Sequence, residues 1–237
     1  MKLLALDTSM QACSAAVLVK EDGACKIHSL LEHRERGHAE RLMPMIDEVL
    51  VLAGLSVRDL DRLAVTTGPG TFTGVRIGVA TARGLALALG LPLVAQNSLR
   101  VIAAQAFESC PPLPKRLIGV VIDARRDQLY FQLFDQHGAY KNSAPQVIFP
   151  QQAEKILPTD KTTFLIGSGR DILNQHIGEK LCKNIELSDF GENNPQPDAR
   201  QLARLAFDMI PTEQPVAPLY LRPPDAKIQS GYAIERK

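Results

Sequence analysis

The strongest local signal for chemistry is a glycine loop, Gly68-Pro69-Gly70-Thr71-Phe72-Thr73, between a predicted buried strand and a predicted long helix. Backbone amides at a helix N-terminus can hold an anion. A P-loop needs Lys and then Ser or Thr directly after its last glycine, but Val75 and Arg76 follow Gly74. The spacing of the glycines also departs from the dinucleotide-binding fingerprint. The pattern therefore favours a tight turn that brings the helix close to a sheet.

Two aspartates follow predicted strands at matching places in the two halves of the chain. Asp7-Thr8-Ser9 ends the first strand, and Asp123 ends a strand in the second half. Such turns could bind a magnesium-bound phosphate. However, Ala124-Arg125-Arg126 offers neither glycine nor hydroxyl, so we interpret Asp7 as a turn or capping residue rather than a catalyst. A vestigial nucleotide site would comprise Asp7, Thr8, Ser9, Gly68 and Gly70.

Three histidines, His28, His33 and His38, raise the question of a metal site. They are five residues apart, whereas a helical pair of ligands needs a spacing of three or four. We expect no metal and no cofactor, and we expect the loop HRERGH to tolerate the loss of its histidines. With 5% aromatic residues and no tryptophan, we also expect no platform for stacking single-stranded bases.

The composition narrows the class of protein. A net charge of +1 gives no long-range field that would draw the chain to RNA or to a membrane, so any RNA contact is local or shared with a partner. Four cysteines lie far apart without a CxxC pair, which is typical of a reducing cytoplasm. Apolar stretches are interrupted well before the ~20 residues of a membrane helix, so we expect no membrane contact.

The elements that position these residues follow from hydrophobic periodicity. In the chain before residue 110, this periodicity predicts the order βββαβαβα. The predicted helices run from about Leu42 to Ala53, from Gly74 to Leu89, and from Asn97 or Ser98 to Phe107. Three prolines near residue 112 mark a linker, which predicts an α/β lobe at 1–110 and a second at 111–237. The second part repeats the motif of strand, Asp, turn and strand at 116–134, and later predicts a strand near 164–166 and a helix at 198–210.

The first two predicted helices carry more apolar surface than one sheet can cover. Residues 42–52 form a wide apolar arc, and the helix from Gly74 has small residues at Gly78 and Ala82 that allow close approach of another backbone. Such helices are covered on two sides. The second cover is either another domain of this chain or another chain.

Five segments together resemble the TsaB (YeaZ) family: LALDTS, CSAAVL, HAERLMPMIDEVL, TTGPGTFTGVRIGVATARGLALALGLPLV and APLYLR. The resemblance implies an α/β fold of the two-lobed actin-like ATPase (ASKHA) type, with duplicated mixed sheets flanked by helices. It also implies a non-catalytic subunit that supports transfer of threonylcarbamoyl to N6 of the adenosine adjacent to the anticodon in tRNA.

The resemblance further implies the partners, which are a TsaD-like catalytic paralogue and a TsaE-like ATPase, with tRNA met only as part of the complex. The same helices would serve a homodimer. Alternatives are a nucleotide-dependent phosphotransferase or a metallopeptidase of the same fold, although the HxxxH metal motif of TsaD is missing. The expected partner interface consists of Leu42, Met45, Ile46, Val49, Leu50, Gly74, Ile77, Gly78, Thr81, Ala82 and Leu85.

Overall fold

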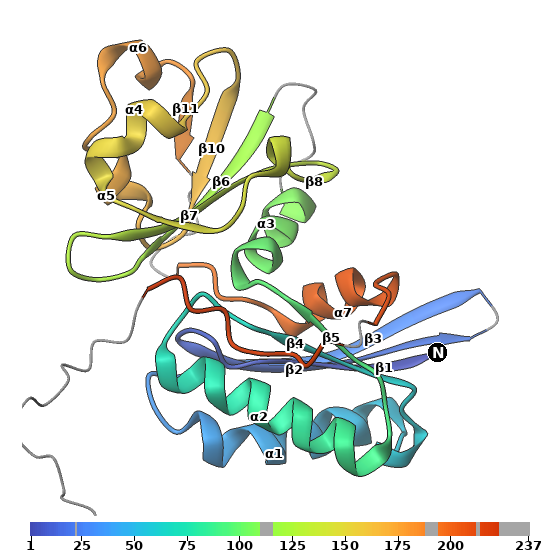
Figure 1. Cartoon of the computed structure of the whole chain (residues 1–237). Helices are drawn as coiled ribbons and strands as arrows, with labels where there is room; N and C mark the ends of the chain where they lie inside the picture. The colour runs from blue at the N-terminus through green and yellow to red at the C-terminus, as the bar shows by residue number, and fades with distance from the viewer. Residues whose placement is uncertain (22, 110–115, 188–193, 212–213, 223–237) are drawn as a thin grey trace, which may run out of the picture.

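The computed structural model describes residues 1–21, 23–109, 116–187, 194–211 and 214–222. The chain forms two lobes, each built on a mixed sheet (Figure 1). The first sheet has the order β3-β2-β1-β4-β5, in which β1 is antiparallel to β2 and parallel to β4. Its strands are β1 (Lys2–Asp7), β2 (Ala12–Glu21), β3 (Ala24–His33), β4 (Arg62–Thr66) and β5 (Leu93–Gln96).

The second sheet repeats this order as β8-β7-β6-β10-β11, with β6 antiparallel to β7 and parallel to β10. A short strand, β9, adds to β7. The strands are β6 (Arg116–Asp123), β7 (Leu129–Asp135), β8 (Gly138–Ala139), β9 (Gln146–Ile148), β10 (Thr162–Ile166) and β11 (Ile185–Leu187). Because β1 and β6 hold equivalent places, the predicted duplication of strand, Asp, turn and strand is confirmed.

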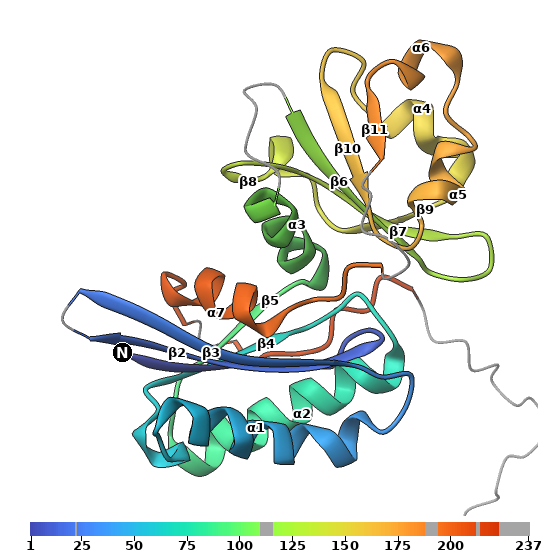
Figure 2. The same ribbon diagram turned by 180° about the vertical axis from the view of Figure 1, so that it is seen from behind.

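Three helices cover the first sheet (Figures 1 and 2). Helices α1 (His38–Ala53) and α2 (Phe72–Leu89) pack on one face, and α7 (Ala199–Phe207) packs on the other. The alternation of β1 serves both faces, because Leu4 and Leu6 contact the α1 and α2 side whereas Leu3 and Ala5 contact α7. The predicted order βββαβαβα is confirmed for the first part of the chain.

Two helices do not pack with the part of the chain from which they come. Helix α3 (Ser98–Ser109) packs on the second sheet, where Leu99 and Ile102 meet Ile118 and Val120 of β6. Helix α7 returns to the first sheet, as does the segment around Val216. The predicted boundary between residues 110 and 111 lies at the edge of the described residues. Helix α3 precedes this boundary but packs on the second sheet, and helix α7 follows it but packs on the first sheet.

Short elements cover the outer face of the second sheet, and the sequence did not predict them. Each helix there has only four or five residues, too few to show an apolar period. These helices are α4 (Ala153–Ile156), α5 (Arg170–Asn174) and α6 (Glu179–Cys182), and two 3-10 turns of the same lobe are η2 (Tyr140–Asn142) and η3 (Pro150–Gln152). A further 3-10 turn, η1 (Val57–Asp59), lies in the first lobe.

Helix α2 is the one helix in the described ranges that is long and apolar enough to cross a membrane by length and composition. Its inward stripe nevertheless packs on the first sheet, with Gly74, Val75, Gly78, Val79 and Ala82 buried. The helix begins earlier than predicted, because the Thr71 hydroxyl accepts a hydrogen bond from Gly74 N at 3.2 Å and caps its first turn.

Glycine lets the start of α2 lie directly against the turn after β1. A Cβ added at Gly74 would lie 2.1 Å from the Thr8 carbonyl oxygen, and one at Gly70 would lie 2.0 Å from the Ser9 carbonyl oxygen. One at Gly78 would lie 2.7 Å from the Thr8 hydroxyl. The two backbone oxygens cannot move aside as a flexible side chain could, so these contacts require glycine.

Gly74→Ala is therefore expected to destabilise the chain by about 1–3 kcal/mol through overpacking. Gly84 of the same helix is the matched control, since a Cβ there meets nothing within 4 Å. Gly84→Ala should stabilise the isolated chain by about 0.5–1 kcal/mol, as alanine does at an open helix position. Urea unfolding measures both, and a Gly74→Ala variant as stable as Gly84→Ala would refute the close contact.

Candidate functional site

The turn after β1 is a closed hydrogen-bonded network. Asp7 is fully buried, and its carboxylate accepts hydrogen bonds from Ser9 N at 3.2 Å and from the Ser9 hydroxyl at 2.8 Å. The Thr66 hydroxyl of β4 also donates to Asp7. The Ser98 hydroxyl, at the start of α3, donates to Ser9 at 2.8 Å. The network thus joins β1, β4 and the helix that leads into the second lobe.

Burial raises the pKa of Asp7 to about 6, since the charged form loses its hydration. The hydrogen bonds from Thr66 and Ser9 act in the opposite direction and lower this pKa, while the negative charge of Asp198 raises it slightly further. A carboxyl group in this state is held by the interior of the protein rather than presented to a ligand.

The five residues of the expected nucleotide site do lie together, but the chain itself occupies the space around them. Thr8 donates to Gly74 O at 2.7 Å, and Thr71 N donates to Ser9 O at 2.8 Å. Gly68 has a left-handed backbone with φ of 97°, and its carbonyl accepts from Ser98 N at 2.8 Å. The glycine loop therefore serves as the tight turn that its sequence favoured, and it covers Asp7.

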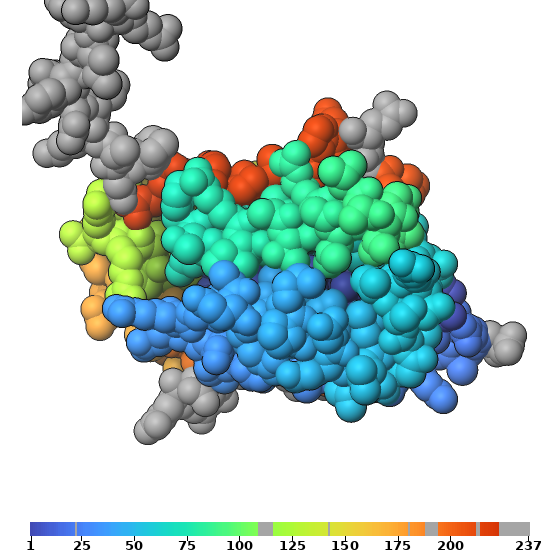
Figure 3. All heavy atoms as spheres, turned by 90° about the horizontal axis from the view of Figure 1, so that it is seen from below, coloured from blue at the N-terminus to red at the C-terminus, as the bar shows by residue number. Residues whose placement is uncertain are grey.

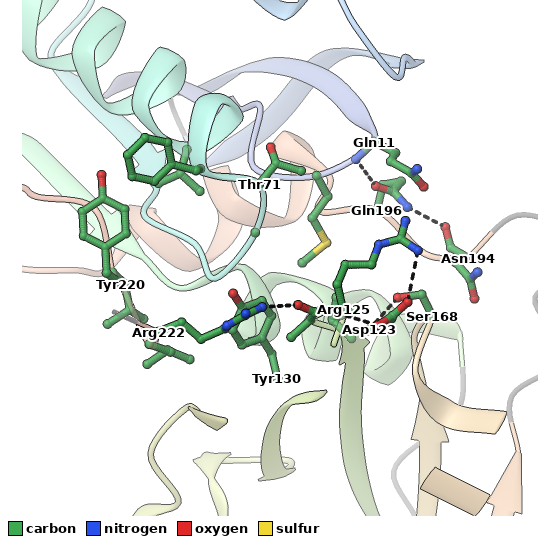
Figure 4. Close-up of a pocket in the computed structure, with 18 of the residues that line it drawn as sticks. Gln11, Thr71, Asp123, Arg125, Tyr130, Ser168, Asn194, Gln196, Tyr220 and Arg222 are labelled. Atoms are coloured by element: carbon green, nitrogen blue, oxygen red, sulfur yellow. Dashed lines mark hydrogen bonds and ion pairs between the residues drawn. The ribbon is translucent and has the colours of Figure 1, made fainter. Parts of the chain in front are cut away.

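The equivalent turn in the second lobe is open. Asp123 is partly exposed, its carboxylate accepts from Arg125 N at 2.7 Å, and it forms an ion pair with the Arg125 guanidinium at 3.4 Å. The Ser168 hydroxyl accepts from Asp123 N at 3.0 Å (Figure 4). Arg125, Arg126 and Asp127 follow with left-handed φ of 63°, 56° and 57°.

A cavity of about 670 Å³ lies between the two lobes, and Asp123 rather than Asp7 lines it. The first lobe contributes Met10 and the start of α2, and the second lobe contributes the ends of β6 and β7. The returning chain closes the remaining sides with residues 194–196 and 219–222. The sequence missed this cavity because its walls come from six separate segments.

The three histidines differ in burial, with His28 partly buried, His33 exposed and His38 buried. In the described part of the chain, no group of three His, Cys, Asp or Glu side chains could hold a metal ion. His38 is nevertheless no solvated loop residue, because it is buried at the start of α1 with its Nε2 3.0 Å from Met10 O. The interpretation of HRERGH as an exposed loop therefore does not hold for His38, whose contact with Met10 O lies beside the cavity, and tolerance to loss of the histidines stays a prediction.

Most of the expected partner interface faces inward. Five residues of α1 and three of α2 are buried in the core of the first lobe, because the stripe with helical spacing is the one that packs on the sheet. They are Leu42, Met45, Ile46, Val49, Leu50, Gly74, Gly78 and Ala82. Only Ile77, Thr81 and Leu85 among the expected residues are partly exposed.

The outer faces of the same helices carry the apolar residues that remain available. The exposed fraction is 76% for Val51 and 87% for Leu87, and Met43 and Leu52 are also exposed. Figure 3 shows α1 and α2 side by side across this face of the molecule. The sequence did contain a signal for this surface. These apolar residues lie on the outer face of each helix, where polar residues are usual.

Two lobes with the same strand order and a cavity between them define an α/β protein of the actin-like ATPase (ASKHA) type. The family model described as "TsaD: tRNA N6-adenosine threonylcarbamoyltransferase" matches residues 32–204. The tRNA threonylcarbamoyladenosine biosynthesis protein TsaB of Haemophilus influenzae is 37% identical over 93% of each chain. The chain belongs to the TsaB (YeaZ) family.

Two further comparisons agree. TsaB of Bacillus subtilis is 31% identical over 83% of this chain and 84% of its own length. The solved structure of YeaZ from Pseudomonas aeruginosa superimposes with a TM-score of 0.73 at 30% identity, covering 93% of this chain and 99% of that one. The similarity thus extends through both lobes.

The raised pKa of Asp7 predicts a specific dependence of stability on pH. The folded chain binds the proton with a pKa of about 6, well above the ordinary aspartate value of 3.8. Protonation therefore stabilises the fold fully below the lower value, and this stabilisation is lost as the pH rises through the higher one. A difference of about two pKa units corresponds to about 3 kcal/mol.

Asp7→Asn has no carboxyl group to protonate, so it should not lose this stabilisation as the pH rises. Its free energy of unfolding minus that of the parent chain should therefore increase by about 3 kcal/mol from about pH 4 to about pH 7. Urea unfolding across that range gives the difference. In Thr66→Val the change should shift to higher pH, because the Thr66 hydrogen bond lowers the pKa of Asp7. Parallel pH profiles for Asp7→Asn and the parent chain would contradict the prediction.

Proposed function

We propose that the chain supports synthesis of threonylcarbamoyladenosine in tRNA as a non-catalytic partner subunit in the cytoplasm. It acts with a TsaD-like catalytic paralogue and a TsaE-like ATPase, and it meets tRNA only as part of that complex. Family membership supports a role in this pathway, because the relatives are named as tRNA threonylcarbamoyladenosine biosynthesis proteins. The chemistry of the site supports the non-catalytic role.

The observation that carries the non-catalytic role is the covered turn at Asp7. A phosphotransferase of this fold would need this carboxylate to face a metal-bound phosphate. Here the loop at Gly70 and the start of α2 lie over it, and Ser9 and Thr66 engage its oxygens. Asp123 is paired with Arg125, which further disfavours a magnesium-bound nucleotide between the turns.

The proposed partner surface is the outer face of α1 and α2. It consists of Met43, Val51 and Leu52 of α1 and Ile77, Thr81, Leu85 and Leu87 of α2. The α2 side also exposes Ala80, Gly84 and Ala88, four residues apart, where small side chains let a partner helix approach closely. A paralogue of the same fold would present an equivalent pair of helices, and a homodimer would use the same face.

The purified chain alone is expected to show no magnesium-dependent ATP turnover, because neither turn presents a free carboxylate to a metal-bound phosphate. The measurement is phosphate release with and without magnesium, beside an Asp7→Asn sample. Turnover that requires magnesium and is lost in Asp7→Asn would establish the phosphotransferase alternative instead.

The partner surface is tested by a Val51→Glu, Leu87→Glu double variant. Because both side chains are exposed, the variant should unfold at the temperature of the parent chain. A charge buried without a partner at an interface costs about 2–5 kcal/mol, so binding to the TsaD-like paralogue should weaken by roughly 30-fold or more. Calorimetric titration measures the affinity, and size exclusion of the chain alone reports the homodimer.

Ile210→Glu is the matched control, since Ile210 is 86% exposed but lies after α7, away from α1 and α2. It should bind as the parent chain does. Ile46→Glu should instead fail to fold, because Ile46 is only 1% exposed within the core. Unchanged affinity of the double variant for the paralogue would remove this face as the partner surface.

A further inference from the structure

The cavity between the lobes has chemistry that the proposed partner role does not use. We propose that it binds a small anionic ligand, a carboxylate or phosphate monoester joined to an apolar body, with the anionic group against Arg125. The inference is independent of the proposed function, because it concerns the cavity and not the outer face of α1 and α2.

Positive charge predominates in the lining. Arg76, Arg125 and Arg222 face a single carboxylate, that of Asp123. The Arg125 side chain is 80% exposed, and its distance of 3.4 Å to Asp123 makes a loose ion pair. A guanidinium has five N–H donors, so this one contact leaves Arg125 able to bind a carboxylate or phosphate in the cavity.

Contacts with two aromatic residues position Arg76 in the lining of the cavity. Its guanidinium lies 3.7 Å from the centre of the Phe72 ring, and its Nε donates to the Tyr220 hydroxyl at 2.7 Å. The Phe72 and Tyr220 rings stack with their centres 5.6 Å apart. These contacts fix the position of the cation before a ligand arrives, which lowers the entropic cost of binding.

Three hydroxyl groups in the lining each accept a hydrogen bond from the protein. Ser168 already accepts from Asp123 N at 3.0 Å, and Thr71 accepts from Gly74 N at 3.2 Å. Tyr220 accepts from Arg76. A hydroxyl that accepts one hydrogen bond keeps its own proton to donate elsewhere. The cavity therefore offers hydroxyl donors beside its guanidinium groups, which suits a ligand rich in acceptor oxygens.

Amide side chains of Gln11, Asn194 and Gln196 line one part of the cavity, and Met10, Ile122 and Val75 give it apolar surface. The ring of Tyr130 also lines it (Figure 4). The volume of about 670 Å³ is ordinary for a small-molecule site. The ligand therefore has an apolar body beside its anionic group. It does not reach Asp7, which lies beneath Gly70 and Gly74, so the site differs from a metal-nucleotide site formed by the two turns.

Two anionic probes and one neutral analogue test the proposal on the full chain. Phenylacetate and phenyl phosphate, titrated by two-dimensional NMR, should each give saturable shifts at residues of the cavity, and their relative affinity distinguishes a carboxylate from a phosphate ligand. The neutral analogue 2-phenylethanol should bind roughly tenfold more weakly or not at all, because it lacks the charge that Arg125 recognises.

Arg125→Gln should weaken the anionic probes by about fivefold or more, and it should leave thermal unfolding unchanged because the side chain is largely exposed. Arg83→Gln is the matched control, an exposed arginine of α2 that does not line the cavity, and it should bind as the parent chain does. The proposal is overturned if neither probe saturates, if 2-phenylethanol binds equally well, or if Arg125→Gln has no effect.

Discussion

The contact on which the rest of the structure depends is the one between the backbone of the turn after β1 and the first turns of α2. Carbonyl oxygens of Thr8 and Ser9 lie where any side chain at Gly74 or Gly70 would have to be. This contact fixes the angle at which α2 leaves the sheet, and so decides which stripe of α2 is buried and which faces outward. It also closes Asp7 away from solvent, which separates this chain from an enzyme that uses the same turn.

The two aspartates show how one motif can acquire two different surroundings. Both follow a strand and precede a turn and an antiparallel partner. After Asp7 the chain supplies hydroxyls at Thr8 and Ser9 that fold back into the interior, whereas after Asp123 it supplies arginines that stay at the surface. The first turn consequently became part of the core and the second became part of a cavity wall. The two lobes share their strand order, whereas the two turns differ in backbone conformation as well as in side chains.

The sequence predicted most of the first lobe and little of the outer layer of the second. Strands β1, β2 and β4 carry clear apolar runs, and Gly54 and Gly90 end the first two helices as their left-handed φ requires. The sequence could not show that Ile46 and Gly78 face the sheet of their own lobe, since a wide apolar arc does not state which side is covered from within. Nor could local periodicity reveal His38 beneath Met10 or the cavity, because both depend on contacts between distant segments.

The return of α7 to the first sheet has a consequence for the order in which the molecule can assemble. The Ser14 hydroxyl of β2 accepts a hydrogen bond from Ala199 N, which lies 185 residues later in the chain. Leu3, Ala5 and Leu18 on one face of the first sheet pack against residues 199–207. During synthesis by the ribosome this face therefore stays uncovered until the second lobe has been made. The N-terminal sheet is the first to be translated, but its packing is completed only after residues 199–207 have been made. An apolar face exposed for that time is a surface that chaperones can bind.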